Sequence, residues 1–238
     1  SSRSERRRHF VAQLSRKRPG DGEADAYARR ALALLAHLSD LHLLKDPDEQ
    51  AAIFDALVSA IESERRRRGR GFDLLAITGD VFDSATFAPH AAVRHFASLH
   101  DRLRRALGPD VATVIVPGNH DRRRIGLVGP HRETLFQTLR DELGDAAWVH
   151  GCTPPILADV VPPERHGLPL WLVVYDSTYV PHGWLSAGGM LRQQDLLYAA
   201  SRIGHRHPDW PIVFLLHHHL VPTPFTDLQS IILEGENR

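Results

Sequence analysis

The stretch FDLLAITGDVFD (Phe72–Asp83) joins an apolar run to a glycine turn that is followed by two acids. An unbroken apolar run of this length is typical of a strand that is buried on both faces of a sheet. The same design occurs upstream in ALALLAHLSDLHL (Ala31–Leu43) and downstream in VATVIVPGNHD (Val111–Asp121). Each run ends in acids, histidines or an asparagine, so these strands carry the candidate site as well as the fold.

Helical patterns separate the three strands. PDEQAAIFDALVSAIESE (Pro47–Glu64) has Ile53, Leu57 and Ile61 at intervals of four, with acids near its start, and Phe87–Leu107 also has helical spacing. Strands that alternate with helices predict an α/β first half. Further helices are expected over His131–Leu143 and Arg192–Ser201.

The second half of the chain changes character. WVHGCTPPI (Trp148–Ile156) and LPLWLVVYDSTYV (Leu168–Val180) are predicted to be strands, because they combine apolar runs with Pro-rich turns and leave no room for a long helix between them. A last strand is expected in WPIVFLLHHH (Trp210–His219). This order predicts two stacked sheets that are flanked by helices.

The composition indicates an ordinary soluble globular protein. The 238 residues are 42% hydrophobic and 24% charged, a length that suits one domain. No apolar run approaches the roughly 20 residues that span a bilayer, and no signal peptide opens the chain. The lone cysteine, Cys152, excludes an internal disulfide and suits a reducing compartment, so a cytoplasmic location is expected.

The basic residues are unevenly placed, although the net charge is zero with histidine neutral. The first thirty residues hold nine Arg or Lys against four Asp or Glu. We expect residues 1–30 to form a basic, partly disordered arm and residues 31–238 to form the catalytic domain. The neutral total argues against a nucleic-acid coat protein, but the basic arm and the Arg clusters leave nucleic acid as a possible partner.

Side chains of the metal-binding type follow the predicted strands. Because ligands bind at the carboxyl ends of strands in α/β sheets, these side chains are expected to converge. Asp40 and His42 lie two apart, which would place them on one face of an extended backbone. Gly79 would let the chain turn sharply and bring Asp80 close to a metal. The remaining candidates are Asp83, Asn119, His120, Asp121 and the triplet His217, His218 and His219.

Four segments together resemble the signature blocks of the calcineurin-like metallophosphoesterase superfamily. They are DLH (Asp40–His42), GDVFD (Gly79–Asp83), GNHD (Gly118–Asp121) and LLHHH (Leu215–His219). The resemblance implies a four-layer α/β/β/α sandwich around a centre of two divalent metal ions. Carboxylate and imidazole ligands suit Mn, Fe or Zn rather than Ca, and Mn is the expected ion.

The resemblance also implies a role for each residue. Asp40 and His42 would hold the first metal, Asp80 would bridge both metals, and Asn119 and His217 would hold the second. His218 is the alternative to His217 as that ligand. His120 would act at the leaving group and Asp121 would orient it. Arg122, His218 and His219 are candidates for substrate binding.

One block of the superfamily pattern is missing from its expected place. A Gly-His-x-His segment should follow His219, but no histidine occurs between there and Arg238. GHRH (Gly204–His207) has the right letters but precedes the last strand, so we interpret it as a surface turn. We therefore expect that the domain is incomplete at its C-terminus, and that the missing ligands lie beyond Arg238 or come from a partner chain.

The predicted function is hydrolysis of a phosphomonoester or phosphodiester by a hydroxide that bridges two metals. The substrate would be a cyclic nucleotide, a nucleotide or a nucleic acid. The missing block leaves two alternatives open. One is a metal-poor regulatory or binding module of the same fold, and the other is a nuclease subunit that needs a partner. The sequence does not indicate the oligomeric state.

Overall fold

The computed structural model describes residues 33–43, 48–83, 89–121, 135–150, 156–178, 189–204, 210–218 and 231–234. The chain divides into two units, residues 1–32 and 33–238, and every described residue belongs to the second. The predicted basic arm therefore lies outside the described residues, as do Arg122, His219 and the GHRH segment beyond Gly204.

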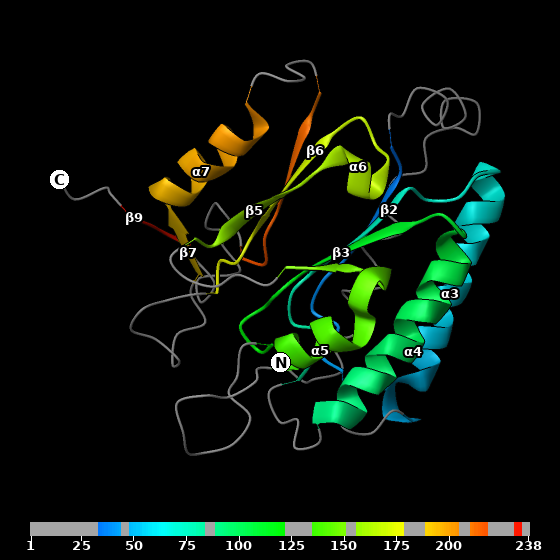
Figure 1. The fold of residues 1–238 in the computed structure, drawn as a ribbon. Helices are drawn as coiled ribbons and strands as arrows, with labels where there is room; N and C mark the ends of the chain where they lie inside the picture. Colours follow the sequence, from blue (N-terminus) through cyan, green and yellow to red (C-terminus); the bar gives the residue numbers. More distant parts are fainter. Residues whose placement is uncertain are drawn as a thin grey trace. The chain divides into compact units, whose positions relative to one another are not determined.

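Helices and strands alternate through the first half, as the sequence predicts, and strands dominate the second half (Figure 1). The elements are β1 (Leu35–Leu38), α3 (Asp48–Arg68), β2 (Leu74–Thr78), α4 (Pro89–Leu107), β3 (Ala112–Val116), α5 (Leu135–Leu143), the 3-10 turn η2 (Gly144–Ala146), β4 (Trp148–Val149), β5 (Ala158–Val161), α6 (Pro163–His166), β6 (Trp171–Tyr175), β7 (Gly189–Arg192), α7 (Gln193–Ile203), β8 (Ile212–Leu215) and β9 (Ile231–Glu234).

The strands form separate sheets with different pairing. The first sheet has the order β1-β2-β3-β4, and all of its neighbours are parallel. The second has the order β5-β6-β8, with β5 antiparallel and β8 parallel to β6. Strands β7 and β9 pair in parallel. A mixed α/β fold is thereby confirmed, while the four-layer order of the sandwich stays a prediction.

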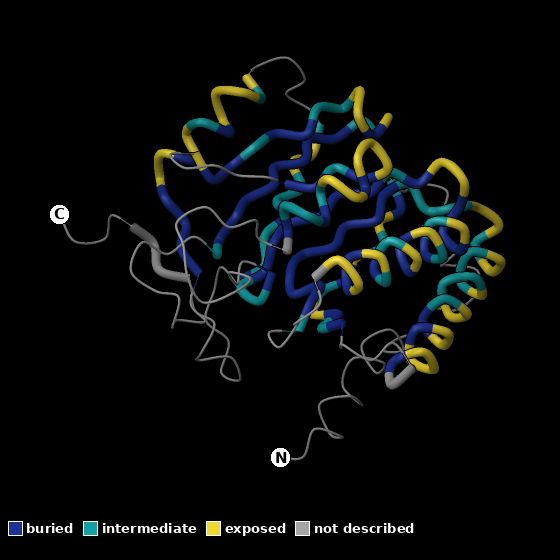
Figure 2. The backbone as a smooth tube through the Cα atoms, turned by 60° about the horizontal axis from the view of Figure 1, so that its bottom comes forward, coloured by how far each residue is buried: buried dark blue, intermediate teal, exposed yellow. Residues whose placement is uncertain are grey.

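Side-chain alternation along β2 explains why its sequence is apolar throughout. Leu75 and Ile77 pack in a core with α3, α4 and α5, whereas Leu74 and Ala76 pack in a second core with β6 and β8. Successive side chains of a strand point to opposite faces, so a strand that is covered on both faces needs apolar residues at every position. Figure 2 shows these strands as buried and the outer faces of the helices as exposed.

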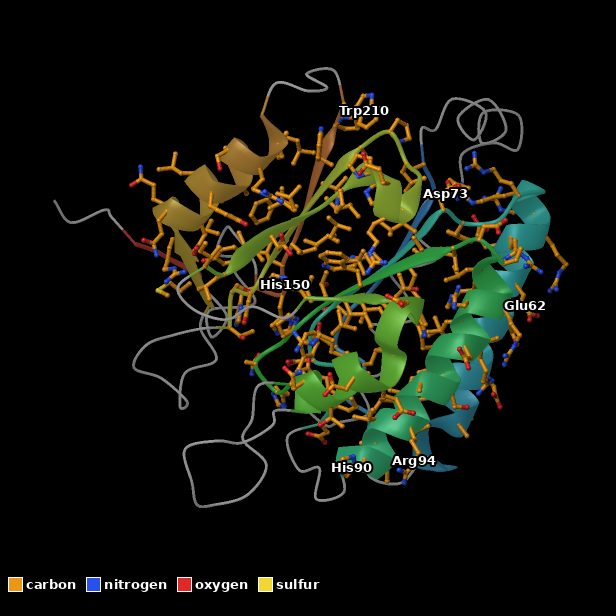
Figure 3. All side chains as sticks on the ribbon, viewed as in Figure 1. Glu62, Asp73, His90, Arg94, His150 and Trp210 are labelled. Atoms are coloured by element: carbon orange, nitrogen blue, oxygen red, sulfur yellow. The ribbon has the colours of Figure 1, made fainter. Side chains whose placement is uncertain are left out.

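The second sheet repeats this pattern. Leu172 and Val174 of β6 pack in the second core, together with Leu74 and Ala76 of β2. Val173 and Tyr175 point to the other face and pack in a third core, which includes residues of α7 and β7. Charged side chains lie outside these cores. Figure 3 shows Glu62 and Arg94 on the outer side of the helices and His150 in the interior. None of the helices in the described part of the chain is long and apolar enough to cross a membrane.

Three strands of the structure were not predicted. β5 escapes detection because it is short and carries Asp159 at its second position, which breaks the apolar run. β7 and β9 are four residues each and have no flanking pattern that marks them as strands. The predicted helices are present, with boundaries that differ by a few residues from those expected.

His100 of α4 is a buried polar residue inside the helical side of this fold. It has no exposed surface, and its Nε2 lies 3.0 Å from Thr113 Oγ1 on β3. Burial lowers the pKa of His100 to about 4, helped by the positive charge of Arg104. The folded protein therefore keeps this ring neutral at a pH where an unfolded chain, with a pKa near 6.5, takes up a proton.

We expect the free energy of unfolding to fall as the pH drops from 6.5 toward 4, in part because of His100. In His100→Gln, which keeps a hydrogen-bonding group near Thr113, this fall should be smaller by about 1–2 kcal/mol. Urea denaturation at pH 7 and pH 4.5 measures the difference. His90→Gln, an exposed position at the start of α4, should behave like the wild type. An unchanged pH dependence in His100→Gln would contradict the assignment.

Candidate metal centre

The loops after β1 and β2 are held side by side beyond the ends of the strands. The backbone amide of Asp40 donates to the carbonyl of Gly79 at 3.1 Å, and that of His42 donates to the carbonyl of Asp80 at 2.9 Å. A parallel bridge between Leu43 and Phe82 continues the pairing. The candidate residues of the first two blocks are therefore fixed to each other through the main chain.

Three candidate ligands have an unusual backbone conformation. Asp40, His42 and Asp80 have φ angles of 56°, 44° and 50°, and they are the only non-glycine residues with positive φ in the described part of the chain. Such angles cost roughly 1 kcal/mol or more each and persist where the surrounding structure enforces them, often at functional sites. The extended backbone predicted for Asp40 and His42 is thus wrong, and left-handed turns bring the two side chains together instead.

Two glycines allow the loops to approach closely. A Cβ atom on Gly118 would lie 2.1 Å from both the backbone nitrogen and Oδ1 of Asp80. A Cβ atom on Gly79, which has a φ of 83°, would lie 2.5 Å from Nδ1 of His217 and 2.7 Å from the Cα of Gly118. The loops after β2, β3 and β8 therefore meet at a distance that only glycine permits.

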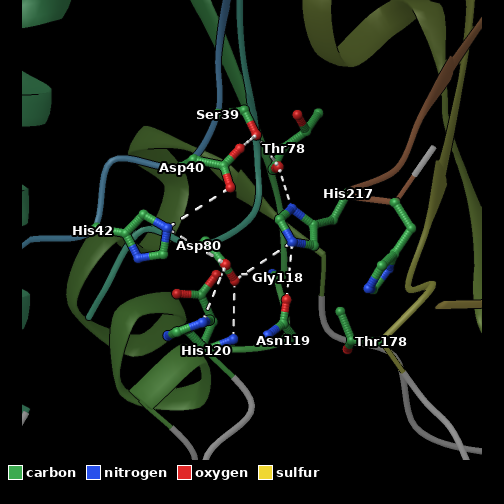
Figure 4. Close-up of polar contacts among 12 residues, drawn as sticks. Ser39, Asp40, His42, Thr78, Asp80, Gly118, Asn119, His120, Thr178 and His217 are labelled. Carbon is green, nitrogen blue, oxygen red and sulfur yellow. Dashed lines mark hydrogen bonds and ion pairs between the residues drawn. The ribbon is translucent and has the colours of Figure 1, made fainter. Parts of the chain in front are cut away.

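Asp80 lies at the centre of this meeting point (Figure 4). Its side chain is 3% exposed, and its Oδ1 accepts a hydrogen bond from the His120 amide at 2.9 Å. Oδ1 lies 3.6 Å from His217 Nε2, and Oδ2 lies 3.7 Å from Nε2 of both His42 and His120. The two oxygens thus face different sets of imidazoles.

These separations fit a shared cation better than a hydrogen bond. Hydrogen bonds between nitrogen and oxygen have lengths of about 2.7–3.2 Å, which these pairs exceed. Two ligands that each lie about 2.1 Å from one metal ion are at most roughly 4.2 Å apart. His42 Nε2 meets this condition with Asp40 Oδ1 at 3.8 Å and with Asp80 Oδ2 at 3.7 Å, and ligand atoms of the three residues all lie within 4.8 Å of one another.

His217 is oriented as a ligand of the second group. Its Nδ1 lies 3.0 Å from the carbonyl oxygen of Thr78, which can only accept, so Nδ1 carries the proton and Nε2 presents a lone pair. Nε2 faces Oδ1 of Asn119 at 3.1 Å and Oδ1 of Asp80 at 3.6 Å. Three electron-pair donors that converge in this way fit a cation. The contact from Thr78 is made by main chain, so no sequence pattern could predict it.

The charges around Asp40 and His42 reinforce each other. The Asp40 carboxylate raises the pKa of His42, against the effect of burial. Burial acts to raise the pKa of Asp40, but the contacts with His42 and Ser39 outweigh it and leave the pKa below its usual range. Ser39 Oγ also donates to the Thr78 carbonyl at 2.9 Å, and Gln50 donates to the His42 carbonyl at 3.0 Å. These contacts keep Asp40 ionised and fix the turn.

His120 belongs to a second possible ligand group. Its ring packs edge-on against His42 with 4.9 Å between the centroids. Donor atoms of His42, Asp83 and His120 lie within 4.8 Å of one another. Asp83 follows β2 in the GDVFD segment, but the superfamily resemblance assigned it no role. The geometry therefore brings His120 close enough to act either at a leaving group or as a ligand.

The carboxylate of Asp121 is held by backbone amides. It is fully buried, and its carboxylate accepts hydrogen bonds from the backbone amides of Phe82 at 3.0 Å and Gly118 at 2.8 Å. Burial raises the pKa of Asp121 to about 6, although these amides oppose the shift. These contacts do not test the predicted role of Asp121 in orienting His120, which stays a prediction. Asp121 ties the loop after β3 to the loop after β2.

His218 is buried against Ser177. It is 3% exposed, its Nδ1 lies 2.8 Å from Ser177 Oγ, and its backbone amide donates to the same oxygen at 3.3 Å. A Cβ atom on Gly189 would lie 2.4 Å from the His218 ring, so β7 covers it closely. Of the adjacent pair, His217 is the residue that faces Asn119 and Asp80.

Comparison with known families supports this reading of the four segments. A family model described as calcineurin-like phosphoesterase matches residues 33–231 of the chain. This range contains all four segments that converge around Asp80. A search of curated proteins found no match.

We expect Gly118→Ala to disrupt the centre, because the added methyl group would overlap Asp80. The free energy of unfolding should fall by roughly 2–4 kcal/mol, and Mn²⁺ binding should weaken at least about ten-fold. Urea denaturation and Mn²⁺ titration measure these effects. Gly144→Ala is the matched control, since a Cβ there has no atom within 4 Å and meets only the cost of a positive φ. Wild-type stability and Mn²⁺ affinity in Gly118→Ala would contradict the packing argument.

Proposed function

Since the chain belongs to the calcineurin-like phosphoesterase family, we propose that it hydrolyses phosphate esters with two divalent cations at the Asp80 centre. The family suggests metal-dependent hydrolysis of phosphate esters. The number of cations, the ligands and the role of each residue are our proposals.

The arrangement of Asp80 is the observation that carries the proposal. One buried carboxylate turns Oδ2 toward His42 and Oδ1 toward His217, and these imidazoles come from loops more than 170 residues apart in the sequence. A carboxylate between two groups of ligands suits a bridging role. We assign Asp40, His42 and Asp80 to the first cation and Asp80, Asn119 and His217 to the second.

The ligand atoms indicate which cations fit. Imidazole nitrogen and carboxylate oxygen suit Mn, Fe or Zn, and we propose Mn²⁺ as the ion to test first. When bound, two such cations supply positive charge to phosphoryl oxygens and lower the pKa of water to near neutrality. A site with so few anionic ligands should hold its second cation weakly, because Asn119 is a neutral amide.

The side chains around the cations have separate tasks. Asn119 presents its amide on the second side of Asp80, where it can stabilise charge on a phosphoryl oxygen. His120 Nε2 lies 3.7 Å from Asp80 Oδ2, next to the proposed cations. We propose that His120 donates a proton to the leaving oxygen of the substrate. Asp121 fixes the loop that carries both residues, and acts as a positioning residue.

Hydrolysis with two cations suits phosphomonoesters and phosphodiesters alike, so we propose this broad class of substrates, with nucleic acid included. Arg122 and His219 remain proposed substrate contacts. For His218, burial against Ser177 and Gly189 supports a different role, which is to hold the turn that carries His217.

Phosphoesterase activity should depend on added metal and on Asp80. With Mn²⁺, the protein should hydrolyse bis-p-nitrophenyl phosphate, EDTA should abolish the reaction, and excess Mn²⁺ should restore it. Asp80→Asn should lower kcat/KM at least about 100-fold, because the amide lacks the charge that holds two cations. Asp55→Asn, at an exposed carboxylate paired with Arg102, should retain activity. Undiminished turnover in EDTA would exclude this function.

Metal counting should separate the ligand from its neighbours. His217→Ala should reduce bound Mn²⁺ toward one per chain, because the second cation would keep only Asp80 and Asn119. His120→Ala should lower kcat with little loss of metal, as expected of a proton donor rather than a ligand. Elemental analysis after gel filtration in Mn²⁺ measures the ratio.

His218→Asn is the control for this experiment, since an amide can still reach Ser177. It should keep the wild-type metal content. Equal metal loss in His217→Ala and His218→Asn would argue against the assignment of His217. Loss of metal in His120→Ala would place His120 with His42 and Asp83 as a ligand.

A further inference from the structure

A cavity of about 290 Å³ lies at the other end of β3 from the metal centre. Residues Val111–Val114 line it at the start of the strand, whereas the Asn119–Asp121 loop follows the strand's end. A strand of five residues spans roughly 16 Å, so the two places are distinct. The end of α4, the η2–β4 segment, β5 and α6 complete the walls.

His166 of α6 lines this cavity and has a buried ring nitrogen without a well-formed hydrogen bond. It is 9% exposed, and its Nδ1 accepts a hydrogen bond from the Leu168 amide at 3.2 Å. Burial lowers the pKa of His166, against the effects of the Val161 backbone and Glu164, so the ring is neutral at pH 7. With Nδ1 as acceptor, the single proton is on Nε2.

That proton has no acceptor of good geometry among the described residues. Nε2 is buried and makes no hydrogen bond there. The Val161 backbone raises the pKa of the ring as a hydrogen-bond acceptor does, but Nε2 has no partner that meets both the distance and the angle of a well-formed hydrogen bond. A buried donor left in this state costs about 1–3 kcal/mol, which a ligand oxygen would recover.

Arg104 of α4 adds a second donor in the same cavity. Its Nε is buried and has no hydrogen-bond partner among the described residues. Other arginines nearby are paired, since Arg102 contacts Asp55 and Arg165 contacts Asp145 at 3.6 Å. Two buried donors on one cavity, one of them a guanidinium, suit the oxygens of an anion.

Trp148 and Arg165 form another part of the cavity wall. The guanidinium carbon of Arg165 lies 5.2 Å from the centroid of the Trp148 ring, which is half-buried. A planar molecule can stack on such a guanidinium–indole pair. Asp110 and Asp145 also line the cavity, but both are exposed and so lie at its rim. Their charges disfavour a ligand with many negative charges.

We propose that this cavity binds a small planar molecule with one carboxylate or phosphate group. The anionic oxygens accept hydrogen bonds from Arg104 and His166, and the ring stacks beside Trp148 and Arg165. The volume suits one ring system with its acidic group, near the lower limit of small-molecule sites. This site is independent of the metal centre and does not rest on the proposed function.

The test uses the full chain in EDTA, so that cations at Asp80 make no contribution. Benzoate and phenyl phosphate are titrated by calorimetry and by tryptophan fluorescence, with inorganic phosphate and benzyl alcohol as probes that lack the ring or the charge. We expect saturable binding of benzoate or phenyl phosphate in the millimolar range or tighter, and at least about ten-fold weaker binding of the other two. The tighter of the two ring-bearing probes identifies the acidic group as carboxylate or phosphate.

Two substitutions assign the binding to this cavity. Arg104→Met and His166→Phe keep most of the side-chain volume and should each weaken binding at least about ten-fold. Arg102→Met, on the same helix but outside the cavity, should bind like the wild type. The proposal is overturned if neither ring-bearing probe binds, if inorganic phosphate binds as tightly as both, or if Arg104→Met binds like Arg102→Met. Should His166→Phe fail to fold, the two arginine variants alone decide the question.

Discussion

The buried carboxylate of Asp80 is the constraint on which the candidate site depends. Its side chain is 3% exposed, and among the described residues it contacts one backbone amide and lies near three imidazoles at distances too long for hydrogen bonds. An ionised carboxylate in such surroundings is unfavourable unless positive charge compensates it. The proposed cations provide that charge, and their binding should therefore stabilise the folded protein as well as activate it.

The sheet, main-chain hydrogen bonds and two side features of the loops keep the loops close to Asp80. The parallel sheet delivers the loops after β1, β2 and β3 to one edge, and main-chain hydrogen bonds continue between Asp40, His42 and the Gly79–Asp80 turn. Gly118 permits the contact from the third loop, and Asp121 ties that loop back to Phe82. Three left-handed non-glycine residues at one place indicate strain, which the apolar cores on both faces of the sheet can offset.

The sequence predicted the order of the main elements because strands covered on both faces need continuous apolar runs, as in β2 and β3. It also predicted that the four segments converge at the carboxyl ends of strands, but a shared sheet edge explains only the first three, because the fourth segment follows β8 of the second sheet. It gave the wrong reason for Asp40 and His42, because single-residue left-handed turns have no clear signature in Asp or His. Asp121 accepts from the Phe82 amide and His218 contacts Ser177, and contacts this distant in sequence cannot be predicted from spacing. The cavity beside Arg104 and His166 is likewise assembled from several elements.

The most direct test of the central claim is a crystal structure of the protein grown with saturating Mn²⁺, with anomalous scattering measured at the manganese edge. Two anomalous peaks on opposite sides of Asp80 are expected. One should be bound by Asp40 and His42, and the other by Asn119 and His217. A single peak, or peaks that do not contact the Asp80 carboxylate, would contradict the account of Asp80 as the bridge between two cations.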